Sequence, residues 1–188
     1  MKFSKWVALG WACALLSGTQ PLYAAELLNT PVYNPATKSY FEMVDGAHGL
    51  TTGYNAFEGP TWRQANEEAQ ARVYKNARGR LAIIRDSATH QFLASTFRPE
   101  REVWIGLRYW CQLHEAQWTD GKKLTAQDFQ IWDKVWRADP YACNTGTGDP
   151  SSEYAGIAYK RLPDFRWIGA GTAKRFYIFF VEYPTGGP

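Results

Sequence analysis

Residues suited to catalysis or metal binding are scarce in this chain, which has three histidines and three cysteines among 188 residues. His48, His90 and His114 share no short spacing, and none belongs to a paired motif such as His-Glu-x-x-His, so the sequence disfavours a histidine metal site. It also lacks a Gly-x-Ser-x-Gly nucleophile elbow, and the run from Gly169 to Gly171 is too short for a phosphate-binding loop. We therefore expect a protein that is not an enzyme.

An excess of charge of one sign is also missing. Removal of Lys2 and Lys5 with a cleaved leader lowers the formal net charge from +3 to +1. A nearly neutral chain gives no electrostatic case for binding nucleic acid or an anionic membrane. After residue 25 no stretch is long and apolar enough to cross a bilayer, so we expect neither a nucleic-acid partner nor an integral membrane segment.

The N-terminal segment has the layout of an export signal. Lys2 and Lys5 precede an apolar run from Trp6 to Leu16, polar residues and Pro21 end that run, and Leu22-Tyr23-Ala24 offers a cleavage site. The apolar run is too short to span a membrane, so residues 1–24 are predicted to be a cleaved signal peptide and the protein to be periplasmic or secreted. The mature chain then keeps Cys111 and Cys143, which in an exported protein are expected to form one disulfide, with two buried free thiols as the alternative.

The mature chain is predicted to begin with an extended lead-in at 25–38 and to continue as one domain at 39–188. Thr61 is expected to cap a helix that ends at Gly79, and a second helix should run from Ser87 to just before Pro99. The apolar stripe of the first helix consists of Trp62, Ala65, Ala69 and Val73. Strands are predicted at 39–44, 81–84, 103–107, 117–119, 154–160 and 175–183, with a weaker one at 165–168. A long irregular loop separates them at 122–152, which gives an α+β architecture.

Four short motifs occur in an order that belongs to a known family. They are Gly79-Arg80-Leu81-Ala82-Ile83-Ile84, Trp104-Ile105-Gly106-Leu107, Trp118-Thr119-Asp120-Gly121 and Phe180-Val181-Glu182-Tyr183-Pro184. In this order the chain resembles the C-type-lectin-like domains of secreted bacterial proteins, from about Tyr40 to Pro184. The resemblance implies two helices packed on antiparallel sheets with a long irregular loop region. It also implies an exported binding module for a carbohydrate or a protein, with adhesion among its roles.

The chain departs from the family in its cysteines. Members usually carry two disulfides, but the corresponding positions here, near Tyr74, Val181 and Ala155, are not cysteine. The resemblance places Cys111 and Cys143 where they would staple the long loop to the segment after the Trp-Ile-Gly-Leu strand. A loop held in this way loses less entropy when it binds a ligand.

The calcium site of the sugar-binding members is incomplete in this chain. In those members Glu-Pro-Asn or Gln-Pro-Asp in the loop and Trp-Asn-Asp on a strand supply oxygen ligands, of which calcium needs six to eight. The nearest matches here are the run Asp149 to Ser151 and the run Trp167 to Gly169, and the second offers no side-chain oxygen. His90 stands about where the family often has a ligating Glu. We expect no cofactor, with a calcium site rebuilt around Asp164 as the alternative.

Aromatic and polar residues of the long loop and the following strand form the predicted binding face. This face comprises Trp136, Tyr141, Asn144, Asp149, Ser151, Glu153, Asp164, Arg166 and Trp167. An exposed tryptophan can stack on a sugar or anchor a protein partner, whereas Trp132 and Trp136 can equally be core residues. The alternative function is a structural component of a surface complex, in which residues 26–38 and 46–60 would form the contact. Neither hypothesis fixes the oligomeric state.

Overall fold

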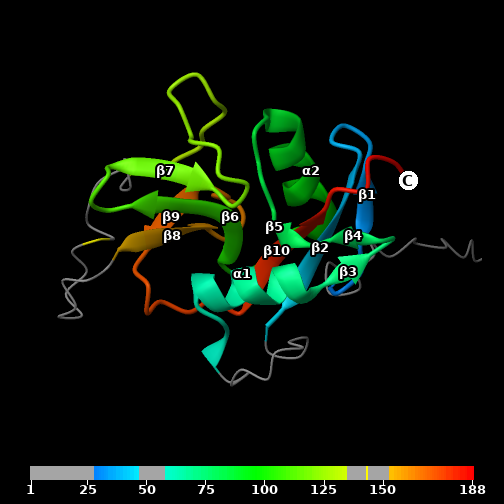
Figure 1. Ribbon diagram of the computed structural model, residues 1–188, viewed down its shortest axis with the longest axis horizontal. Coiled ribbons are helices and arrows are strands. Elements are labelled where there is room, and N and C mark those ends of the chain that lie inside the picture. Colours follow the sequence, from blue (N-terminus) through cyan, green and yellow to red (C-terminus); the bar gives the residue numbers. More distant parts are fainter. Residues whose placement is uncertain (1–27, 47–57, 135–142, 144–152) are drawn as a thin grey trace, which may run out of the picture.

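The computed structural model describes residues 28–46, 58–134, 143 and 153–188 (Figure 1). The helices are α1 (Trp62–Ala71) and α2 (Ser87–Phe97). The strands are β1 (Val32–Asn34), β2 (Ser39–Asp45), β3 (Val73–Tyr74), β4 (Ala77–Arg78), β5 (Arg80–Leu81), β6 (Val103–Trp110), β7 (Glu115–Trp118), β8 (Tyr154–Tyr159), β9 (Trp167–Ala170) and β10 (Ile178–Tyr183). This is the predicted α+β class.

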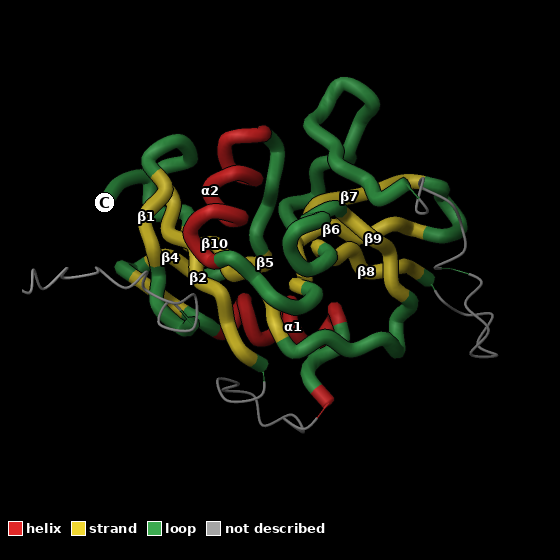
Figure 2. Tube along the Cα trace, turned by 180° about the vertical axis from the view of Figure 1, so that it is seen from behind, coloured by secondary structure: helices red, strands yellow, loops and turns green. Residues whose placement is uncertain are grey.

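One large sheet organises these strands in the order β1-β2-β10-β6-β8-β9. β5 pairs with β10 and β7 with β6, while β3 and β4 form a separate hairpin. The ladders are antiparallel except for β10 and β6, which run parallel with Phe179 opposite Trp104. The two ends of the domain pair with each other, because β2 and β10 are antiparallel with Tyr40 opposite Tyr183 (Figure 2).

The lead-in belongs partly to the sheet. β1 pairs with β2, with Val32 opposite Phe41 and Asn34 opposite Ser39. The sheet therefore begins at Val32 and not at residue 39, because β1 pairs with the edge of β2 that faces away from β10. The alternative function, a structural component of a surface complex, placed residues 26–38 in the contact with a partner. Part of that segment, β1, instead pairs within the chain's own sheet.

The start of α1 follows its sequence signal, but its end does not. The Thr61 hydroxyl accepts a hydrogen bond from the Gln64 amide, and the Gln64 side chain accepts one from the Thr61 amide, which makes a capping box. The predicted continuation to Gly79 is wrong, since the helix ends at Ala71 and Val73 is 67% exposed. Two positive-φ residues between β3 and β4 close a two-residue hairpin in its place.

The predicted limits of α2 are confirmed. The Asp86 side chain accepts a hydrogen bond from the Thr89 amide at 2.7 Å, so that α2 begins at Ser87. At the other end Arg98 adopts a left-handed conformation directly before Pro99.

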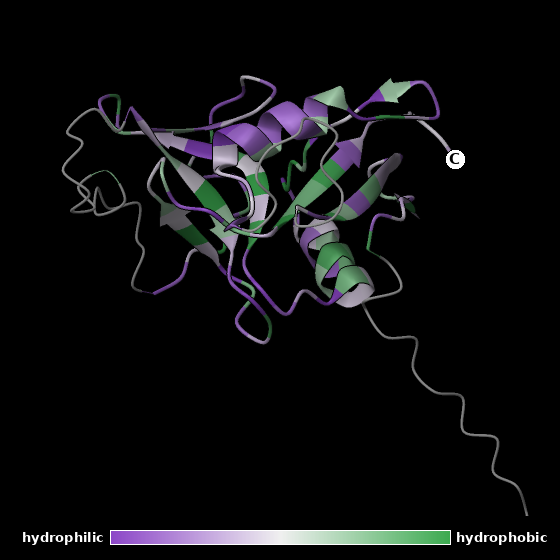
Figure 3. Ribbon diagram, turned by 90° about the horizontal axis from the view of Figure 1, so that it is seen from below, coloured by the Kyte–Doolittle hydropathy of each residue, from purple (hydrophilic) through white to green (hydrophobic). Residues whose placement is uncertain are grey.

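The two helices cover opposite faces of the central strands, as alternate residues of β10 show. Phe180 packs in one hydrophobic cluster with Leu93 and Phe97 of α2. Phe179 and Val181 pack in the other with Trp62, Ala65 and Ala69 of α1. In Figure 3, α1 is coloured mostly hydrophilic, which fits a helix that buries only one narrow stripe.

The central strand β6 carries the Trp-Ile-Gly-Leu motif in the core, as the strand predicted at 103–107. Trp104 is fully buried, and its indole N–H donates to the Pro60 carbonyl at 2.9 Å. A Cβ at Gly106 would collide with the carbonyl oxygen of Leu81, so glycine is needed where the two backbones approach.

Candidate functional site

The first part of the long loop is bonded to the edge of the sheet. The Trp167 amide donates to the Ile131 carbonyl at 2.8 Å, and the Asp133 amide donates to the Trp167 carbonyl at 2.9 Å. The rings of Trp132 and Phe129 meet the Trp167 ring edge-on, with centroids 5.3 and 5.9 Å away. Residues 129–133 therefore cover the edge of β9 and form the first anchor of the loop.

A disulfide provides the second anchor. Cys111 and Cys143 are bonded, 32 positions apart in the sequence with Cα atoms 5.8 Å apart. The staple between the long loop and the segment after β6 is thus confirmed. The Cys111 amide also donates to the Glu153 carbonyl at 3.1 Å, which holds the end of the loop where β8 begins. The loop is attached at three points: near Asp133, at Cys143 and at Glu153.

An ammonium group joins two carboxylates beside the first anchor. Lys160 Nζ lies 2.9 Å from Asp164 Oδ2 and 3.1 Å from Asp133 Oδ2. These hydrogen bonds, to Asp164 first and to Asp133 second, raise the pKa of Lys160. The charges of Asp133 and Asp164 are therefore partly compensated by a cation that the chain itself supplies.

The described part of the predicted binding face is divided between two places. Asp164 and Arg166 are exposed near the first anchor, and Arg166 Nη1 lies 3.5 Å from the Trp132 carbonyl oxygen. Glu153 is exposed at the opposite end of β8, so the structure does not bring it to the other two. The remaining loop residues lie outside the described part: Trp136, Tyr141, Asn144, Asp149 and Ser151.

Trp167 was predicted on the exposed face, and this prediction is wrong. Its side chain is fully buried, at the centre of a cluster of aromatic rings from three parts of the chain. The rings around it are those of Trp118, Phe129, Trp132 and Tyr159. The strand register explains this position, because Trp167 pairs with the buried Tyr159 on β8. Its ring therefore packs in the core and contacts the first anchor of the loop through Phe129 and Trp132.

His90 lies in an aromatic pocket on α2. Its Nδ1 is 3.0 Å from the Tyr159 hydroxyl, and the rings of Phe129 and Phe165 lie 5.6 and 5.3 Å from its own. Burial, and then the positive charge of Arg166, lower its pKa. Among the described residues no group of three or more His, Cys, Asp and Glu side chains is placed to hold a metal ion.

Sequence reasoning missed a cleft of about 430 Å³ at the far end of β6 and β7. Its lining residues are Trp110, Gln112, Leu113, Glu115, Gln117, Lys123 and Glu153. Only Glu153 was predicted as a site residue. The cleft exists because β6 continues three residues beyond the Trp-Ile-Gly-Leu motif, to Trp110. In the sequence, Arg108 and Trp110 continue the two-residue alternation of the strand beyond Leu107. This pattern could have indicated that the strand extends to Trp110.

The family follows from a direct match. The family model for the lectin C-type domain matches residues 58–155, just over half of the chain. The chain belongs to the C-type lectin domain family. Its fold agrees with this assignment, and the order of helices, strands and long loop is the one that the sequence resemblance implied.

Solved C-type lectin domains share this fold at low sequence identity. The carbohydrate-recognition domain of cow CD23, determined in the presence of a GlcNAc2Man3 oligosaccharide, is 18% identical with a TM-score of 0.52, over 81% of this chain and 91% of that one. The corresponding domain of the mouse scavenger receptor C-type lectin is 17% identical with a TM-score of 0.51, over 77% and 89%. The lectin CEL-I from Cucumaria echinata is 17% identical with a TM-score of 0.50, over 77% and 89%. A search of curated protein sequences finds no match.

The described part of this C-type lectin domain contains no helix that is both long enough and apolar enough to span a membrane. It does contain one disulfide, between Cys111 and Cys143, and disulfides are typical of extracellular proteins.

Proposed function

We propose that this C-type lectin domain is an exported recognition module, not an enzyme, that binds a carbohydrate or protein ligand through its long-loop region without calcium. The observation that carries the proposal is the attachment of that loop at Asp133, Cys143 and Glu153. A loop already tied to the scaffold loses less conformational entropy on binding, so more of the contact energy appears as affinity. Membership of the family supports carbohydrate as the first class of ligand to test.

Two features support binding without calcium. Lys160 places its ammonium between Asp133 and Asp164, so a bound cation there would have to displace the chain's own positive charge. Ile168 and Gly169 follow Trp167 without side-chain oxygens, and calcium requires six to eight oxygen ligands. Asp164, the carboxylate considered for a rebuilt site, is thus engaged with Lys160.

Export is the other component of the proposal. The predicted signal peptide, residues 1–24, lies outside the described residues. The disulfide between Cys111 and Cys143 supports an oxidising compartment, either the periplasm or the medium. The nearly neutral mature chain supports a glycan or a surface protein as the partner and not a nucleic acid.

The experiment is a glycan-array screen of the mature chain, residues 25–188, run once with calcium and once with a chelator. The expected result is the same set of bound glycans in both buffers. Loss of all signal in the chelator would overturn the calcium-free part of the proposal and leave the lectin part intact. Absence of signal in both buffers would overturn carbohydrate as the ligand, and pull-down of surface proteins would then test the protein alternative.

A further inference from the structure

The cleft at the end of β6 and β7 is built on one face of the sheet. In the antiparallel ladder Trp110 lies opposite Glu115 and Arg108 lies opposite Gln117. Opposite residues and residues two positions apart project to the same side of a sheet. All four side chains therefore emerge on one face, and Tyr154 joins them because it lies opposite Trp110 on β8.

Trp110 is held in a fixed orientation within this face. Its indole N–H donates to Gln117 Oε1 at 3.0 Å, and Gln117 Nε2 donates to the Gly121 carbonyl at 2.9 Å. The Arg108 guanidinium lies 4.1 Å from the centroid of the Trp110 ring, and the Tyr154 ring meets it at 5.9 Å. These contacts fix the ring before any ligand arrives, although the residue stays only partly buried. A preorganised ring loses little entropy on binding.

Apart from Leu113, the rest of the cleft is polar, and its charges nearly balance once Arg108 is counted. Glu115 forms an ion pair of 2.8 Å with Lys123, and Glu153 adds a second carboxylate to the lining. Gln112 contributes an amide, and Leu113, 64% exposed, lies on the turn between the strands. With Arg108 beside the Trp110 ring, the two carboxylates are matched by two cations, so the cleft has no excess charge to attract an ionic ligand, while its carboxylates and amides accept hydrogen bonds from hydroxyl groups.

We propose that this cleft is a metal-free subsite for a neutral pyranose, whose C–H face stacks on the side of the Trp110 ring away from Arg108 and whose hydroxyls bond to Glu153 and Gln112. A sugar ring has an apolar C–H face and a rim of hydroxyls, which is the complement of an aromatic ring bordered by carboxylate and amide groups. The volume of about 430 Å³ lies within the usual range for small-ligand sites. The inference rests on the proposed lectin function and deepens it, since it names a ligand class and a site at the end of β6 and β7 that shares Lys123 and Glu153 with the two ends of the long-loop region.

The test uses the mature chain in chelator-containing buffer, with cellotriose and triacetylchitotriose as neutral probes and sialyllactose as the anionic one. Trp110→Phe identifies the Trp110 indole resonance in the ¹H–¹⁵N spectrum, because the variant lacks that one N–H. The expected result is that a neutral trisaccharide shifts this resonance and that sialyllactose does not. If neither neutral probe shifts it, or if the anionic probe binds as well, the inference is overturned.

Variants test the roles of the residues. Trp110→Ala should weaken binding of the neutral probe at least tenfold and Trp110→Phe less, while Glu153→Gln should weaken it severalfold. Glu100→Gln is the matched control, since this exposed carboxylate precedes the opposite end of β6, and it should bind like the wild type. An unchanged melting temperature for Trp110→Phe shows that its loss of binding is not unfolding. If the array shows glycan binding that Trp110→Ala leaves intact, the Trp110 subsite is overturned and carbohydrate binding by the domain is kept. If no glycan binds at all, both the subsite and carbohydrate binding by the domain are overturned.

Discussion

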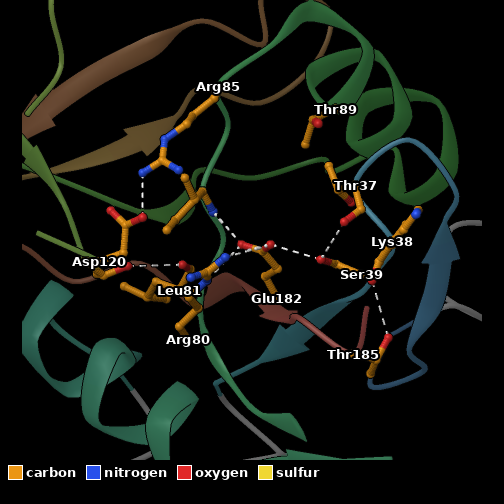
Figure 4. A network of polar contacts seen from close by, with 12 residues as sticks. Thr37, Lys38, Ser39, Arg80, Leu81, Arg85, Thr89, Asp120, Glu182 and Thr185 are labelled. Carbon is orange, nitrogen blue, oxygen red and sulfur yellow. Dashed lines mark hydrogen bonds and ion pairs between the residues drawn. The ribbon is translucent and has the colours of Figure 1, made fainter. Parts of the chain in front are cut away.

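Arg80 donates two parallel hydrogen bonds to the buried carboxylate of Glu182, one from Nε to Oε2 and one from Nη2 to Oε1, each of 3.0 Å (Figure 4). The same carboxylate accepts the Ser39 hydroxyl at 3.1 Å and the Ile83 amide at 3.2 Å. One side chain on β10 thereby joins β2, β5 and the extended segment that follows β5. Because its acceptor positions are filled by donors from three parts of the chain, Glu182 fixes how these parts pack.

Replacing Glu182 by alanine should therefore cost much of the stability of the domain. The change leaves Arg80 without its partner and removes the acceptor of the Ile83 amide. Leaving the buried Ile83 amide without its acceptor costs about 1–3 kcal/mol, and loss of the carboxylate partner of Arg80, whose side chain is 30% exposed, adds a smaller cost. Urea unfolding of the variant and the wild type measures this difference in the free energy of unfolding.

An exposed ion pair provides the matched control for Glu182→Ala. Lys123 and Glu115 are 2.8 Å apart, but their side chains are 61% and 39% exposed. Lys123→Ala should change the free energy of unfolding by less than about 1 kcal/mol, because water screens the pair. Equal losses in the two variants would contradict a special role for burial at Glu182.

The sequence predicts the limits of a helix or strand in this fold only where a local signal, such as a capping residue or a proline, fixes them. Asp86 and Pro99 bound α2 through capping and backbone sterics, so its limits could be predicted. The end of α1 could not, because the apolar stripe continues in register to Val73 while a two-residue hairpin turns the chain there. The pairing of β1 with β2 was missed for a related reason, since three residues carry too little periodicity to mark a strand.

The site was harder to predict than the fold. The disulfide between Cys111 and Cys143 could be predicted because an exported chain with two cysteines offers only one pairing. Trp167 was misplaced because its sequence position near the loop suggests exposure, whereas its register opposite Tyr159 puts it in the core. The cleft beside Trp110 depends on cross-strand neighbours such as Gln117, and a single sequence does not specify the register that joins them.

Trp104→Ala should destabilise the domain by about 3–5 kcal/mol, the usual cost of a large cavity in a core. The Trp104 ring is fully buried against Phe176, with centroids 4.5 Å apart, and its N–H bonds to Pro60. Val73→Ala is the matched control, because Val73 is 67% exposed and its truncation should change stability by less than about 0.5 kcal/mol. Thermal unfolding of both variants distinguishes the two positions. An unchanged melting temperature for Trp104→Ala would contradict the core assignment.

Removal of the disulfide should loosen the long loop more than the sheet. For a separation of 32 residues, chain-entropy arguments give a contribution of about 3–4 kcal/mol from the bond between Cys111 and Cys143. Cys143→Ser should raise amide hydrogen exchange most at Cys111, whose N–H donates to the Glu153 carbonyl, and weaken ligand binding, while the β2–β10 pairing keeps more of its protection. Cys111→Ser and the double variant should match it, because all three lack the same bond. Global loss of protection in these variants would show that the bond supports the whole domain.

His90 should make stability depend on pH below neutrality. Its pKa in the folded chain is lowered, first by burial and then by the charge of Arg166, whereas an unfolded histidine titrates near about 6.5. Above that pH the imidazole is neutral in both states and the full stability is present. As the pH falls below it, the unfolded chain binds a proton that the folded chain does not, so the free energy of unfolding decreases.

The variant His90→Gln should flatten this dependence between about pH 5 and 7, above the range where most carboxyl groups titrate. Glutamine keeps a polar partner for the Tyr159 hydroxyl, which lies 3.0 Å from His90 Nδ1. Arg166→Gln should reduce the slope only in part, because it removes the smaller of the two causes and leaves the burial. Urea unfolding at several pH values in this range measures the slope for each protein. If the slope in His90→Gln equals that of the wild type, the pH dependence belongs to another group. If His90→Gln and Arg166→Gln reduce the slope equally, charge repulsion by Arg166, and not burial, is the main cause.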